Sequence, residues 1–236
     1  MQKQPVAIVF DTFGTVVDWR GSLIAELTEF GRTRGITADW AKLVDAWRGA
    51  YQPSMQRVRS GELPWTRLDD LHRMSLDHLI EQFGITGLTE ADRRHINLGW
   101  HRLTPWPDAV AGLTRLKTRF IIGPLSNGNV ALLTNMAKHV GLPWDMVFGS
   151  DLFGHYKPDP ETYLGVCKLL DLEPGQVMMA AAHNGDLAAA RRVGLMTAFF
   201  PRPKEYGPHQ SRDFKAEQDW DVVAEDIEDM ARRLVA

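Results

Sequence analysis

A continuous apolar run, Val6 to Phe10, stands near the N-terminus and ends abruptly on Asp11. Because apolar and polar positions do not alternate in it, the run predicts a strand buried on both faces of a parallel sheet. Gly14 permits a tight turn directly afterwards. Ligands of open α/β sheets bind beyond the carboxyl ends of the strands, so Asp11 is the first candidate for chemistry. Capping of the turn is the alternative role for this carboxylate.

After residue 19 the pattern becomes helical, and no strand is indicated before about residue 100. The spacing predicts helices over residues 22–30, 39–55 and 66–83, and a fourth after the capping-box sequence that starts at Thr89. A strand-free stretch of this length, placed between one strand and the next, predicts an inserted helical cap over residues 19–100.

Strands and helices alternate again after the Pro-Trp-Pro-Asp sequence at residues 105–108. The apolar runs predict strands over residues 120–125, 146–148, 176–181 and 196–200, and an amphipathic helix over 222–235. Pro124 is awkward within a central strand. The alternation predicts an α/β fold, with a Rossmann-like parallel sheet and right-handed crossovers. We expect residues 1–18 and 101–236 to form this core.

Composition limits the function classes. The 236 residues are 44% hydrophobic and carry a formal net charge of −3 without a basic face, so a large core is expected and nucleic acid is not an expected partner. The one cysteine, Cys167, lies in a helical pattern and excludes a disulfide within the chain, which fits a reducing compartment. We find no signal-peptide pattern and no apolar stretch of the roughly 20 residues that a membrane helix needs. The expected localisation is cytoplasmic, without a membrane partner.

The turns after the predicted strands carry polar residues that the sheet gathers at one edge. They are Asp11, Thr12 and Thr15, then Ser126 and Asn127, then Lys157, and finally His183, Asn184 and Asp186. Each alone has an ordinary interpretation, such as a turn residue, a surface lysine or an acid near a helix N-terminus. Their shared placement favours a catalytic site.

Four motifs carry a resemblance to a known family: Asp11-Thr12-Phe13-Gly14-Thr15, Leu125-Ser126-Asn127-Gly128, Tyr156-Lys157-Pro158-Asp159 and Asn184-Gly185-Asp186. In this order they resemble the haloacid dehalogenase superfamily over essentially the whole chain. Within it, the chain is more similar to the L-2-haloacid dehalogenases than to the phosphatases.

Phe13 is the reason for preferring the dehalogenases. The phosphatases carry a second Asp at this place, which protonates the departing alkoxide as a general acid. Phenylalanine donates no proton, and a halide ion needs none to leave. The phosphatases also bring more carboxylates for magnesium than Asp11 and Asp186 provide. We therefore expect no metal and no other cofactor.

The resemblance implies a covalent reaction on a small 2-haloacid. Asp11 attacks C2 and displaces halide, and water then hydrolyses the ester to a 2-hydroxyacid of inverted configuration. Asp186 activates or orients that water, Lys157 balances the two acids, and Thr15 orients Asp11.

Substrate and halide binding are implied for a further set of residues. Ser126 holds the substrate carboxylate, Asn127 donates to halide or substrate, and Tyr163 reaches toward Lys157. Arg48 matches the cap position whose arginine receives the halide, although a solvent-facing arginine is the alternative. The expected binding set is Arg48, Ser126, Asn127, Thr12, Phe13, Tyr163, His183 and Asn184.

The fourth motif departs from the best-known dehalogenases, because Ala181-Ala182-His183 stands where they carry Ser-Ser-Asn. His183 is either a hydrogen-bond donor toward substrate or Lys157, or a buried histidine without a catalytic part. Removal of fluoride, which needs strong donors, is a hypothesis for such a site. Open alternatives are hydrolysis of another leaving group, a phosphatase, or a silent binding protein. The resemblance is compatible with a homodimer.

Overall fold

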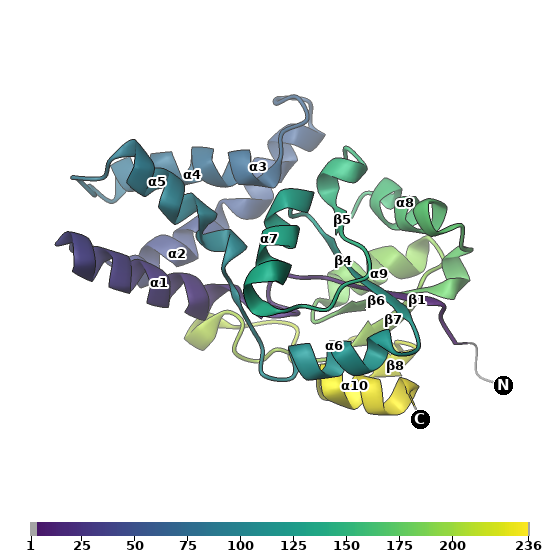
Figure 1. Cartoon of the computed structure of the whole chain (residues 1–236). Helices are drawn as coiled ribbons and strands as arrows, with labels where there is room; N and C mark the ends of the chain where they lie inside the picture. Colours follow the sequence, from purple (N-terminus) through teal and green to yellow (C-terminus); the bar gives the residue numbers. More distant parts are fainter. Residues whose placement is uncertain (1–3, 236) are drawn as a thin grey trace.

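The computed structural model describes residues 4–235, so the two ends of the expected core domain, residues 1–3 and 236, lie outside it. Six strands form one parallel sheet in the order β5-β4-β1-β6-β7-β8 (Figure 1). They are β1 (Ala7–Phe10), β4 (Ile121–Ser126), β5 (Phe148–Gly149), β6 (Val177–Ala181), β7 (Met196–Phe199) and β8 (Val222–Val223). The predicted α/β class is confirmed.

Both faces of the sheet are buried, which explains the non-alternating apolar runs. Ile8 and Phe10 of β1 face one cluster, together with side chains of α6 (Ala109–Lys117), α7 (Val130–Val140) and α10 (Ile227–Leu234). Ala7 and Val9 face the other cluster, with α8 (Pro160–Leu170) and α9 (Asn184–Arg192). The core strand β1 therefore lies between helices on both sides, and its carboxyl end is held at a fixed place.

A helical segment separates β1 from the rest of the sheet. It contains α1 (Trp19–Arg34), α2 (Trp40–Gly49), α3 (Tyr51–Arg59), α4 (Leu68–Gln82), α5 (Glu90–Asn97) and the 3₁₀ helix η1 (Leu98–His101). These helices gather at one end of the sheet in Figure 1. A short antiparallel pair, β2 (Val17–Asp18) and β3 (Thr104–Pro105), joins the two ends of the segment. The capping box that starts α5 is present, between Thr89 and Asp92.

Three local predictions were wrong. The helix predicted over 39–55 is two helices, α2 and α3, that meet at Ala50. The strand predicted over 146–148 is β5, shifted to Phe148–Gly149, because it pairs only with Leu125 and Ser126. The helix predicted over 222–235 begins at Ile227, where Asp226 caps it by accepting from the Asp229 N–H at 2.7 Å.

Two further features are explained by strand pairing. Val222 and Val223 form β8 because they pair with Ala198 and Phe199 at the free edge of β7. Pro124 is tolerated in β4, since β5 pairs with β4 only from Leu125 onward and no ladder bond on that side needs the proline nitrogen.

Candidate active site

Asp11 directly follows β1, and its N–H continues the ladder by donating to the Ala180 carbonyl at 3.0 Å. The side chain is buried, with 8% of the residue exposed. Its Oδ2 accepts from the Thr15 hydroxyl at 2.7 Å, and its Oδ1 accepts from the Lys157 ammonium at 2.8 Å. The carboxylate is therefore fixed from both sides.

The turn after Asp11 positions Thr15. Gly14 has φ of +86°, which is the left-handed region that favours glycine. The Thr15 hydroxyl accepts from the Ala182 N–H at 3.1 Å, and the Thr15 carbonyl accepts from Arg202 Nε at 2.9 Å. Because its oxygen is already held by the end of β6, the Thr15 hydroxyl directs its proton to Asp11.

Lys157 joins the two acids. Its Nζ lies 2.5 Å from Asp186 Oδ2, and its backbone N–H donates to Asn127 Oδ1 at 2.7 Å. The Tyr163 hydroxyl donates to Asp186 Oδ1 at 2.6 Å. Lys157 and Tyr163 come from the loop and helix that follow β5, and Asp186 comes from α9, which follows β6, so side chains from after two strands meet at this edge.

The charges at this edge stabilise one another. Burial alone would raise the pKa of Asp11, but the Lys157 ammonium and the hydrogen bond from His183 lower it below its usual value. Burial would lower the pKa of Lys157, and the charges of Asp11 and Asp186 raise it instead. The pKa of Tyr163 is raised by burial and by Asp186. Near neutral pH the site therefore holds a charged carboxylate, a charged lysine and a tyrosine that donates.

His183 lies between two carboxylates. Its Nδ1 is 3.1 Å from Asp11 Oδ2, and its Nε2 is 2.8 Å from Glu205 Oε2. Burial would lower the pKa of His183, but Glu205 and Asp11 raise it well above its usual value. Sequence reasoning missed Glu205, because it lies in the polar segment after β7 that shows no periodic pattern.

A cavity of about 370 Å³ opens onto Asp11. Of the residues expected from the sequence, it is lined by Asp11, Phe13, Arg48, Asn127, Lys157, Tyr163, His183 and Asp186. Tyr51, Gln52, Tyr206, Arg212 and Asp213 also line it and were not expected. The first two lie on α3, and the others lie in the segment after β7, where no strand end marks them.

Arg48 is the cation that the helical segment contributes. Only 13% of its side chain is exposed, and its guanidinium lies over the rings of Tyr51, at 4.2 Å, and Trp19, at 5.2 Å. Its Nη1 is buried and has no hydrogen-bond partner within residues 4–235. The solvent-facing alternative does not describe this arginine, which has a free donor next to the cavity.

Three expected binding residues lie elsewhere. Asn184 does not line the cavity, and its amide binds Asp213, the Lys215 carbonyl, the Glu217 N–H and Trp220. All of its donors and acceptors are used there, so we remove it from the binding set. The Ser126 hydroxyl is buried and accepts from the Gly128 N–H at 3.1 Å, so it shapes the turn. Thr12 is also buried, and neither residue lines the cavity.

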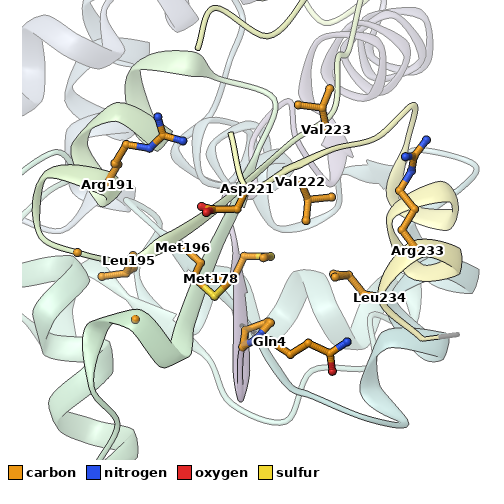
Figure 2. A pocket seen from close by; sticks show the side chains of 13 residues that line it. Gln4, Met178, Arg191, Leu195, Met196, Asp221, Val222, Val223, Arg233 and Leu234 are labelled. Carbon is orange, nitrogen blue, oxygen red and sulfur yellow. The ribbon is translucent and has the colours of Figure 1, made fainter. Parts of the chain in front are cut away.

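A larger pocket, of about 760 Å³, lies at the opposite edge of the sheet (Figure 2). It is lined by Met178 and Met196 at the amino-terminal ends of β6 and β7, with Arg191, Asp221 and Arg233 around it. Within the described chain, no cluster of buried, hydrogen-bonded charges like the one around Asp11 lines this pocket. Volume alone therefore does not identify the site, and the convergent charges do.

Residues 4–235 lack two features that other functions would need. No group of three or more His, Cys, Asp and Glu side chains is arranged to hold a metal ion. None of the described helices combines the length and the apolar character that crossing a membrane requires.

Comparisons with known proteins define the class. The family model of haloacid dehalogenase-like hydrolases matches residues 6–194. A solved L-2-haloacid dehalogenase is 55% identical over 98% of both chains, with a TM-score of 0.95. A solved defluorinating L-2-haloacid dehalogenase is 48% identical over 98% of this chain and 96% of its own, also with a TM-score of 0.95. Among curated relatives, (S)-2-haloacid dehalogenase 1 of Pseudomonas sp. (strain CBS-3) is 29% identical over 214 residues, 85% of this chain and 87% of the relative.

These matches are to hydrolases, and this chain places a buried carboxylate at the end of its first strand. The chain belongs to the haloacid dehalogenase-like hydrolases and, within them, to the L-2-haloacid dehalogenases. The resemblance drawn from the four motifs is confirmed.

Proposed function

We propose that the protein hydrolyses small (S)-2-haloalkanoic acids to (R)-2-hydroxyacids through an ester on Asp11, with inversion at C2. The observation that carries this proposal is the buried Asp11 carboxylate, held by Lys157 and Thr15, next to a cavity that Phe13 lines where a phosphatase would place an acid. The printed names of the two solved relatives at 55% and 48% identity support it.

Asp11 Oδ1 is the nucleophile in this proposal. Oδ2 accepts from Thr15 and lies next to His183, whereas among residues 4–235 Oδ1 has only the Lys157 ammonium. The free lone pair of Oδ1 attacks C2, the C2–halogen bond breaks, and the halide leaves with the electron pair. Water then attacks Asp11 Cγ, and Asp186 accepts its proton while Lys157 and Tyr163 hold that acid in place.

Two cations, Arg48 and Lys157, line the cavity, which suits a substrate that is itself an anion. Arg48 supplies the unpaired Nη1 donor for the departing halide, and the amide nitrogen of Asn127 is available because its Oδ1 already accepts from Lys157. Lys157 and the backbone N–H groups of the turn after β4 bind the substrate carboxylate. We also propose that residues 19–100 act as a cap over this cavity, since Arg48 and Tyr51 reach it from there.

Halide release tests the proposal. We expect chloride from (S)-2-chloropropionate in the presence of EDTA, with little from the (R) enantiomer, because backside attack at a fixed C2 admits one arrangement of substituents. A magnesium-dependent hydrolysis of an aryl phosphate, without chloride release, would support the phosphatase alternative instead.

Fluoroacetate extends the same assay. The 48% identical relative is named as defluorinating, and His183 and Arg48 add buried donors to this cavity. We propose that fluoride is also released. Chloride release from chloroacetate with no fluoride from fluoroacetate would exclude this extension.

We further propose that the protein acts in the cytoplasm and forms a homodimer. The buried, unpaired Cys167 fits a reducing compartment. Light scattering during size exclusion measures the mass directly, and a particle of 26.6 kDa would exclude the dimer.

A further inference from the structure

Glu205 is a buried carboxylate that the steps above do not use. It lies in the segment after β7, and only 1% of the residue is exposed. Its Oε2 binds His183 Nε2 at 2.8 Å, and its Oε1 accepts from the Trp19 indole at 3.1 Å. Arg48 Nη2 is 4.0 Å from the same Oε1. Since a buried acid is costly unless it is paired, this arrangement requires a reason.

The contacts continue from Glu205 to the nucleophile. His183 binds Glu205 through Nε2, and its Nδ1 lies 3.1 Å from Asp11 Oδ2. Thr15 donates to the same oxygen at 2.7 Å. Two donors therefore meet at the Asp11 oxygen that stays outside the new bond when Oδ1 carries the substrate.

We propose that Glu205 is a positioning residue that holds His183 as a charged donor to Asp11 Oδ2, so that His183 and Thr15 stabilise the oxyanion formed when water attacks the ester. This inference rests on the proposed function. Preorganised donors at the oxygen that gains charge are the usual means of accelerating such a step.

The step balances without another reactant. The water oxygen bonds to Asp11 Cγ, its proton passes to Asp186, and the carbonyl electron pair moves onto Oδ2 between His183 and Thr15. The Cγ–Oδ1 bond then breaks, and the product oxygen leaves with that electron pair and takes the proton from Asp186. The second proton of the water is left on the Asp11 carboxyl group; it passes to the free Asp186 carboxylate and from there to solvent. Asp11 is then again a carboxylate, and His183 keeps its proton throughout.

The turn that follows Asp11 packs directly against the Glu205 side chain at Gly14. A Cβ added to Gly14 would lie 2.1 Å from Glu205 Oε1. The φ of Gly14 already favours glycine, and this close approach is a second, independent reason for the residue. The Glu205 carboxylate is thus packed against the backbone of the nucleophile turn itself.

The charges around His183 agree with this role. The anions around it are Asp11, Asp186, Glu205 and Asp213, and the cations are Lys157, Arg48 and Arg212, with Arg212 and Asp213 3.8 Å apart. A protonated His183 makes the charges four and four. Formation of the ester removes the charge of Asp11, and Glu205 then remains as the anion in contact with the imidazolium.

The test measures the two chemical steps separately in the full-length protein. Glu205→Gln keeps the shape of the side chain and removes its charge, and Glu81→Gln, at an exposed position of α4, is the matched control. Quenched single turnovers with (S)-2-chloropropionate, followed by intact-mass spectrometry, report the ester. We expect Glu205→Gln to change ester formation less than about threefold and to slow ester breakdown at least about 30-fold, so that the ester accumulates.

The pH profile gives a second readout. Breakdown should fall as the pH rises through the pKa of His183, because the charged donor is lost. Removing Glu205 lowers that pKa, so the alkaline limb should move to lower pH in Glu205→Gln and stay in place in Glu81→Gln. Equal slowing of both steps, or an unchanged limb without accumulated ester, would overturn the inference.

A second variant covers a failure of Glu205→Gln to fold. His183→Asn should also accumulate ester, and adding Glu205→Gln to it should cause little further slowing, because Glu205 acts through His183. His183→Asn without accumulated ester would also overturn the inference. If the unmodified protein releases no halide from any 2-haloacid, the proposed function itself fails, and the two failures are thereby distinguished.

Discussion

Replacing Lys157 with methionine tests the electrostatic centre of the site. Two unit charges 2.8 Å apart, the distance from Lys157 to Asp11, interact by about 6 kcal/mol at an effective dielectric constant of about 20. Burying the charges offsets most of this, and removal of one partner of a buried pair costs about 3–5 kcal/mol. Asp11 keeps Thr15 and His183, and Asp186 keeps Tyr163, so we expect about 3 kcal/mol of lost stability at pH 7.

The loss should depend on pH in a defined direction. In the unmodified protein the folded pKa of Asp11 is lowered, so its contribution to stability is present above its unfolded pKa of about 3.9 and is lost as the pH falls through the folded pKa. Without Lys157, we expect burial to outweigh the remaining hydrogen bond from His183 and to raise the pKa of Asp11 above its unfolded value. The variant therefore takes up a proton on folding, and its deficit should shrink as the pH falls from 7 toward 4.

Thermal unfolding between pH 4 and pH 8 is the assay. A deficit of about 3 kcal/mol corresponds to a Tm lower by about 6–12 °C for a chain of this size. Lys168→Met, at an exposed position of α8, is the control and should stay within about 0.5 kcal/mol. An unchanged Tm at pH 7, or a deficit that is the same at every pH, would refute the reasoning.

Two other substitutions have sharp expected outcomes. Arg48→Met keeps much of the packing on Tyr51 but removes the hydrogen-bond donors. The kcat for chloride release should therefore fall by about 10²–10³-fold with little change in Tm. Arg57→Met, at the surface, is the control, and an equal rate in the two variants would contradict the halide role. Gly14→Ala should lower Tm more than Gly35→Ala, because both glycines have positive φ but only Gly14 has a neighbour within 4 Å, the Glu205 carboxyl. Equal losses would mean that Glu205 moves aside freely.

Much of the site follows from the strand pattern. Asp11, Asn127, Lys157 and Asp186 all come shortly after the carboxyl ends of parallel strands or in the loops at that edge, and a doubly wound sheet brings such positions together. Their residue types then indicate the chemistry. This argument needs only the order of apolar runs, which the chain displays clearly.

Other positions needed information that is not local. Asn184 stands at the start of α9. Its amide is bound by Trp220, which belongs to the segment after β7, so the role of Asn184 depends on the path of that segment. Glu205 and Arg212 lie in that same irregular segment. Strand β8 was missed because two residues show no period, and only the free edge of β7 explains their pairing.

The place of Glu205 along the chain affects how relatives of this protein are sorted. The family match ends at residue 194, before the loop that brings this carboxylate behind the histidine. Classification by the four shared motifs alone would group together chains that carry an acid at this place and chains that do not. Aligning the loop after the fifth core strand, rather than the motifs, would separate them, and that grouping can be compared with measured rates of ester hydrolysis.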